Sequence, residues 1–134
     1  MVYDQPRAYG MAEALQAALD AVPGVQAYIL TPLDDRPSGG YVWAQVGAVQ
    51  SWADRMDGLA SDASGSIILH CCGYSAAQAI NTDDRVAAAL LDWRWSTDAH
   101  VSPLRCVSVG AVTADRSVPS DVRWGTTRTY RWDA

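Results

Sequence analysis

The residues best suited to chemistry form the run His70-Cys71-Cys72, with Cys106 and His100 as further thiol and imidazole groups elsewhere in the chain. Thiolate and imidazole groups bind zinc, and a cysteine beside a histidine can serve as a nucleophile. The run has the composition of a β-strand, however, and neighbouring side chains of a strand point to opposite faces. The three residues therefore cannot converge on one ion. We expect no metal site and buried, apolar cysteines.

A cysteine nucleophile would also need a base within hydrogen-bond reach and a third group to orient that base. His100 follows the polar segment Ser96-Thr97-Asp98-Ala99, which is typical of a solvated loop rather than of an active-site wall. We therefore predict no catalytic residues and no enzyme activity. A small cysteine-dependent enzyme using Cys71 or Cys72 stays as an alternative.

Two pairs of neighbouring carboxylates, Asp34-Asp35 and Asp83-Asp84, could act as acid and base or bind magnesium. The first pair lies in a stretch rich in turn-forming residues, where aspartate satisfies backbone groups locally. The second pair lies in a predicted helix, where one of the two side chains can face water. The glycines lack the spacing of a phosphate-binding loop. We expect no cofactor.

The elements that must position these residues follow from the spacing of apolar side chains. Helical spacing between Ala8 and Val22 predicts a first helix, and the capping box Ser75-Ala76-Ala77-Gln78 opens a second. The predicted strands are residues 25–30, 41–49, 67–72, 104–112 and 122–132, with a long hairpin connection at 51–66. The order α-β-β-β-α-β-β predicts an α+β fold with a mostly antiparallel sheet of about five strands and two helices packed on one face.

The composition narrows the classes of function. A chain of 134 residues can bury one core, so we predict a single domain over residues 1–134. All ten basic residues are arginine and the formal net charge is −5, which argues against non-specific nucleic-acid binding. The N-terminus lacks the pattern of a signal peptide, and the chain lacks an apolar run of about 20 residues, so we expect a soluble protein made in a cytoplasm.

The aromatic composition favours contacts with a partner. The chain has six tryptophans, six tyrosines and no phenylalanine, and both of the residue types it uses are favoured where a partner buries a surface. The last predicted strand places Trp124, Tyr130 and Trp132 on one face, where we expect core. The interface candidates are Trp43, Trp52, Trp93 and Trp95. A place in the core is the alternative for each of them.

The layout of the whole chain resembles the tail-terminator proteins of long, non-contractile-tailed phages, in the branch found in actinobacterial phages. The stretches that carry the resemblance are Pro23-Gly24-Val25, Pro32, the glycine-rich loop into Tyr41-Val42, the unit from Ile67 to Ala79, Asp84-Arg85-Val86, Leu90 to Arg94, and Thr129 to Trp132. The absence of lysine also suits that branch. Together these stretches span nearly the full length.

This resemblance implies a structural protein of the virion, located in the tail or neck. Six subunits would close into a ring at the head-proximal end of the tail tube, end its polymerisation and join it to the head connector. The implied partners are further copies of the chain, the major tail tube protein, the connector or stopper protein, and genomic DNA that passes through the pore without specific binding. We expect no contact with a membrane.

A ring of this kind leads to a hypothesis about its acidic residues. Like charge would keep passing DNA from adhering to the pore wall, so acidic loops are suited to line it. The pore-facing candidates are Asp34, Asp35, Asp54, Asp57 and Asp62. A head-completion or stopper ring of the neck is the alternative within the same particle, because it requires equally little chemistry.

Overall fold

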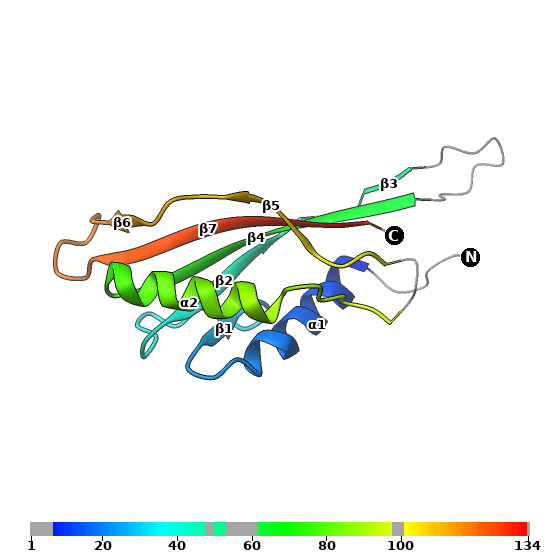
Figure 1. Ribbon diagram of the computed structural model, residues 1–134. Helices are drawn as coiled ribbons and strands as arrows, with labels where there is room; N and C mark the ends of the chain where they lie inside the picture. The colour runs from blue at the N-terminus through cyan, green and yellow to red at the C-terminus, as the bar shows by residue number, and fades with distance from the viewer. Residues whose placement is uncertain (1–6, 48–49, 53–61, 98–100, 134) are drawn as a thin grey trace.

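A computed structural model describes residues 7–47, 50–52, 62–97 and 101–133 of the chain. Within these ranges the elements are α1 (Arg7–Asp20), β1 (Gln26–Tyr28), β2 (Tyr41–Val46), β3 (Gln50–Trp52), β4 (Asp62–Gly73), α2 (Ala76–Ala89), β5 (Arg105–Val109), β6 (Thr113–Asp115) and β7 (Arg123–Asp133). Figure 1 shows the two helices on one side of a long, twisted sheet. None of the described helices is long and apolar enough to cross a membrane.

The strands form one sheet in the order β1-β2-β4-β7-β5, while β3 adds to β4 and β6 adds to β7. The β1–β2 pair is parallel and the other pairs are antiparallel. The long strands β4 and β7 form the centre, in register from Ser64 opposite Asp133 to Gly73 opposite Trp124. The predicted α+β class and the mostly antiparallel sheet are confirmed.

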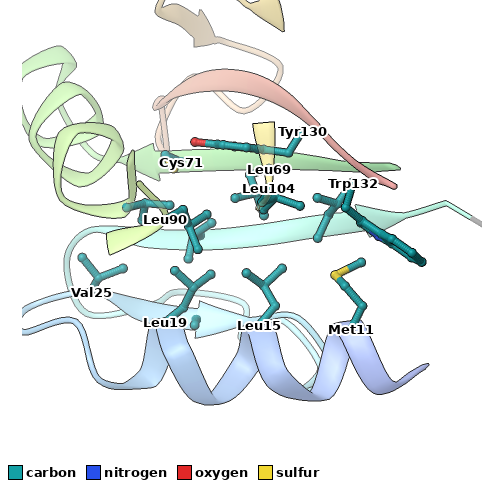
Figure 2. Close-up of a cluster of buried hydrophobic side chains, with 14 residues drawn as sticks. Met11, Leu15, Leu19, Val25, Leu69, Cys71, Leu90, Leu104, Tyr130 and Trp132 are labelled. Atoms are coloured by element: carbon teal, nitrogen blue, oxygen red, sulfur yellow. The ribbon is translucent and has the colours of Figure 1, made fainter. Parts of the chain in front are cut away.

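The core lies between the sheet and the helices (Figure 2). From α1, Met11, Leu15 and Leu19 point toward the sheet at the i, i+4 spacing that the sequence predicts. Tyr130 and Trp132 face them from β7 and are buried, as expected. Trp124 is only half-buried, because it lies near the start of β7, at the opposite end of the strand from Trp132. There it is paired with Gly73 of β4, and the guanidinium of Arg116 lies over its ring.

The start of α2 is capped almost as the sequence predicts. The backbone N–H of Gln78 donates to Oγ of Ser75 at 3.1 Å, which satisfies one of the unpaired donors of the first turn. The side chain of Gln78 instead accepts from the N–H of Tyr74 at 2.8 Å, one residue before the N-cap. The second half of the predicted capping box is therefore shifted by one residue.

Over the described residues the sheet has two more strands than predicted, and β4 begins earlier, at Asp62. Residues 62–66 are small and polar, so their composition indicates a connection, but pairing with β3 over 62–64 and with β7 from Ser64 onward holds them in a strand. Gly65 shows why a small residue is needed there, since a Cβ atom at this position would lie 2.5 Å from the indole of Trp132. The short strands β3 and β6 likewise owe their shape to the long strands they pair with.

Candidate interaction surfaces

The thiol and imidazole groups are divided between the two faces of the sheet. Cys71 lies in the core under the helices, where burial raises the pKa of its thiol far above the usual range. His70 and Cys72 lie on the opposite face, which no helix covers in the described part of the chain. Within that part, no three histidine, cysteine or acidic residues are close enough to hold a metal ion.

His70 is held in the middle of this open face. Its ring stacks on Trp43 with 4.0 Å between ring centroids, and it lies between Gln45 Oε1 at 3.0 Å and Thr127 Oγ1 at 3.4 Å. Desolvation lowers the pKa of His70, and burial raises the pKa of Cys72. Both shifts favour neutral groups. A thiolate–imidazolium pair, as a cysteine nucleophile requires, would need the opposite shifts.

The open face carries a shallow cavity of about 380 Å³ between β2, β4 and β7. Aromatic and polar side chains line it together, among them Tyr41, Trp43, His70 and Arg123. Arg123 is already held there, because it donates to the carboxylate of Asp121 at 2.9 Å and to the carbonyl oxygen of Asp35. The cavity is therefore a packed, internally bonded surface, without a free cationic group from Arg123 to bind an anion.

The second carboxylate pair separates as predicted, with Asp84 exposed and its neighbour buried. Both oxygens of Asp83 accept from the guanidinium of Arg128 at 2.8 Å, and Thr126 donates to Asp83 at 3.2 Å. This bidentate pair fastens α2 to β7 beneath the sheet. Sequence reasoning missed the role of Arg128, although its place on the inward face of the last strand was a signal that it needed a buried partner.

The acidic loop between β1 and β2 is fastened to the sheet. Tyr28 donates its hydroxyl to Asp34 at 3.1 Å, and Tyr74 donates to the carbonyl oxygen of Pro37 at 2.6 Å. Arg36 forms an ion pair with Asp121 at 2.8 Å. Of the pore-facing candidates, Asp34 and Asp35 are exposed on this loop. Asp62 begins β4 and its side chain lies outside the described structure, as do the residues Asp54 and Asp57.

The four interface candidates lie in three different settings. Trp43 is half-buried on the open face, in the stack with His70. Trp93 and Trp95 are half-buried and pack against the core, where Trp95 meets the edge of Trp132 with 5.1 Å between centroids. Trp52 belongs to β3, and its side chain is not described. Partner contacts at these residues stay a prediction, and of the three described side chains only Trp43 is not packed against the core.

The lateral edge of the sheet at β1 is capped by a side chain of α1. The amide of Gln16 donates to the carbonyl oxygen of Ala27 at 2.9 Å. Its oxygen accepts from the backbone N–H groups of Ile29 at 2.8 Å and Leu30 at 3.0 Å. One side chain thus satisfies three backbone groups, of which that of Ala27 lies in β1 and those of Ile29 and Leu30 directly follow the strand.

The opposite lateral edge, at β5, has a different character. All five residues of β5 are exposed, and in the described part of the chain this strand pairs only with β7. A register shift between Cys106 and Ser108 leaves Val107 outside the ladder. Beside the strand lies a mostly apolar groove of about 360 Å³, formed with the end of α2 and lined by Leu90 and Leu91 but also by charged side chains, among them Asp92. In the sequence, the valines at positions 107 and 109 are the signal of an apolar strand edge here.

Comparison with known proteins adds evidence about the fold. No model of a protein family matches the chain, and no curated protein matches it. A chain of a solved structure, the virion of a native gene transfer agent particle, is similar to it with a TM-score of 0.54 and 18% sequence identity. The match covers 95% of this chain and 92% of that chain. The two chains therefore share a fold over nearly their whole lengths.

Proposed function

We propose that this protein is a structural subunit of a phage-like virion and acts as a tail terminator. In this role six copies form a ring at the head-proximal end of the tail tube, end its polymerisation and provide the surface on which the head connector docks. The observation that carries the proposal is the fold shared, nearly end to end, with a chain of a gene transfer agent virion. The resemblance of the sequence to tail terminators gives the finer assignment.

The arrangement of the sheet supports a ring. A closed ring with cyclic symmetry needs two unlike patches on each subunit, which meet head to tail. The sheet offers two such patches, because its β1 and β5 edges lie on opposite sides and differ in how they are covered. Termination further requires that one face of the ring match the tube and that the other face reject more tube subunits.

The acidic residues have a place in the same proposal. Asp34 and Asp35 are held on the fastened loop between β1 and β2, with both residues exposed to solvent. In the ring we expect this loop to face the pore, where its charge repels the phosphates of passing DNA. A ring structure with the loop on the outer rim would overturn this part of the proposal.

Deletion of the gene tests the function directly. A phage that lacks a terminator continues to polymerise its tube, so we expect tails of irregular and excessive length, attached to no head, with normal length restored by the supplied protein. Tails of normal length together with heads that lose their DNA would instead indicate the stopper ring of the neck. Thiol alkylation gives an independent control, because alkylated protein that still supports assembly would argue against a cysteine-dependent enzyme using Cys71 or Cys72.

A further inference from the structure

We infer that the connection between β6 and β7 controls the position of the acidic loop between β1 and β2. It does so through a clasp, which consists of Arg36 of the loop, Asp121 of the connection and Arg123 of β7. A partner that displaces the connection therefore also displaces the carboxylates of Asp34 and Asp35. The inference rests on the proposed function for the pore-facing role of these carboxylates, whereas the clasp itself can be tested in the isolated protein.

The clasp joins three segments of the chain through one carboxylate. The Oδ1 atom of Asp121 accepts from Arg36 at 2.8 Å, and its Oδ2 atom accepts from Arg123 at 2.9 and 3.3 Å. Arg123 also donates to the backbone carbonyl oxygen of Asp35. Both guanidinium groups lie over the ring of Tyr74, at 4.6 and 5.6 Å from its centroid. The loop, the connection and the start of β7 are thus held together at Asp121.

The connection is stiffened by two turns of its own. The backbone N–H of Asp121 donates to the carbonyl oxygen of Val118 at 2.9 Å, across Pro119. The carboxylate of Asp115 accepts from the N–H of Ser117 at 3.0 Å and from its hydroxyl at 2.7 Å. Figure 1 shows the connection, in orange, projecting at the end of the sheet where β7 begins. A force on this projecting segment is therefore carried to Asp121.

The clasp acts on the middle of the loop, because both ends are fastened in other ways. The first residues of the loop are bonded to Gln16, and Pro37 near the other end is fully buried. Between these anchors, residues 31–36 are held by the clasp and by the hydrogen bond from Tyr28 to Asp34. Opening of the clasp should therefore move this segment and leave the anchors in place.

The clasp is also exposed enough to be opened. The side chain of Arg36 is 66% exposed, and those of Asp121 and Arg123 are 26% and 22% exposed. Water screens ion pairs at such positions, so the Arg36–Asp121 bond adds little to the stability of the fold. A charged group of a partner can replace it at small cost. The clasp is thus suited to hold the loop in the free subunit and to release it in a contact.

A spin label at residue 33 tests the clasp. Leu33 lies in the held segment and is 45% exposed, and Cys106→Ser removes the exposed native thiol. In Leu33→Cys/Cys106→Ser, the electron paramagnetic resonance spectrum should show restricted motion. Adding Asp121→Asn should shorten the rotational correlation time at least about threefold, because nanosecond motion of the loop is added to that of the label. The Cys106→Ser protein alone measures the background from Cys72, which is half-buried.

The matched control is Asp115→Asn, since Asp115 belongs to the same chain segment and bonds to Ser117 instead of to the clasp. It should leave the motion of the label unchanged. Arg36→Gln should mobilise the label as Asp121→Asn does, whereas Arg36→Lys keeps the charge and should largely preserve the restricted spectrum. Pro119→Gly loosens the connection without removing a group of the clasp, and should also mobilise the label.

Three results would overturn the inference. They are a label that stays equally restricted in Asp121→Asn, a label that Asp115→Asn mobilises to the same degree, and a spectrum that Pro119→Gly leaves unchanged. Failure of the proposed function can be told apart from these. A label that ignores the clasp, together with overlong tails after gene deletion, rejects only the clasp. Clasp-dependent motion together with normal tails after deletion supports the clasp and rejects the terminator.

Discussion

The two lateral edges of the sheet are each formed by a short strand, β1 or β5, but they differ in what covers them. At β1, the side chain of Gln16 takes up three backbone groups. At β5, valines and backbone face solvent beside an apolar groove. Strand length does not distinguish the edges. Gln16 of α1 covers the β1 edge, whereas near β5 the neighbouring strand β7 is fastened to α2 through the Arg128–Asp83 ion pair. Each side of the sheet can therefore be altered separately.

The largest effect is expected from Asp83→Ala, which removes the partner of Arg128 beneath the β5 side of the sheet. The variant leaves a largely buried guanidinium without its carboxylate, and should lose about 3 kcal/mol in the free energy of unfolding. This value is at the low end for such pairs, because Arg128 can partly reach water. Urea denaturation measures it, with Asp84→Ala as the exposed neighbour that should change stability by less than about 0.5 kcal/mol. Equal losses would contradict the assignment.

Gln16→Ala should make the β1 edge resemble the β5 edge. It removes three hydrogen bonds to backbone groups, of which those at Ala27 and Ile29 are partly buried, and an exposed one to Asp20, so we expect a loss of about 1–2 kcal/mol. Loss of the cap should also make the protein more prone to self-association, as measured by light scattering. Gln45→Ala, on the open face, is the control; it removes one exposed hydrogen bond, to His70, and should have little effect on either quantity. A fully stable, monodisperse Gln16→Ala would show that the glutamine does not guard the edge.

Val107→Lys should close the β5 edge without disturbing the fold. The residue is exposed and outside the strand ladder, so stability should change by no more than about 0.5 kcal/mol. A lysine on an edge strand opposes pairing, and burying its charge in a contact is costly, so association should weaken by at least about tenfold. Sedimentation equilibrium measures this. Val118→Lys, at a similarly exposed valine in the β6–β7 connection, should associate like the wild-type protein.

The smallest effect lies midway between the edges, at His70. Desolvation lowers its pKa in the folded state, so below about pH 6.5 the unfolded chain takes up a proton first. The free energy of unfolding should therefore decline as the pH falls from about 6.5 to the folded pKa, with no contribution above that window. His70→Asn should show a flatter profile, while His100 is common to both proteins. A wild-type protein that gains stability from His70 on acidification would contradict the shift.

The sequence predicts most of the fold, because its signals are local. Helical spacing and the Ser75 cap locate the helices, and alternation locates the inward face of β7 from Thr126 to Trp132. What it missed depends on partners distant in the chain. Residues 62–66 are held in a strand by pairing with β3 and β7, and the buried Asp83 of α2 has its ion-pair partner, Arg128, on β7.

The candidate surfaces were harder to predict, for the same reason. Trp93 and Trp95 have the composition of an interface, yet they pack against the core once the segment after α2 folds back beside it. Nothing in the sequence near Gln16 indicates that its amide will cap a strand more than ten residues later. The sequence shows the acidic pair Asp34-Asp35 and its turn-rich loop. It does not show that Asp34 is bonded to Tyr28 and the backbone of Asp35 to Arg123, because both contacts depend on the tertiary structure.

The most direct test of the terminator role is electron microscopy of the full-length protein mixed with purified tail tubes. The account predicts a ring of six subunits bound at one end of each tube, after which added tube protein no longer extends that end. Tubes that keep growing from both ends, or protein that coats the tube wall and leaves its ends bare, would contradict it.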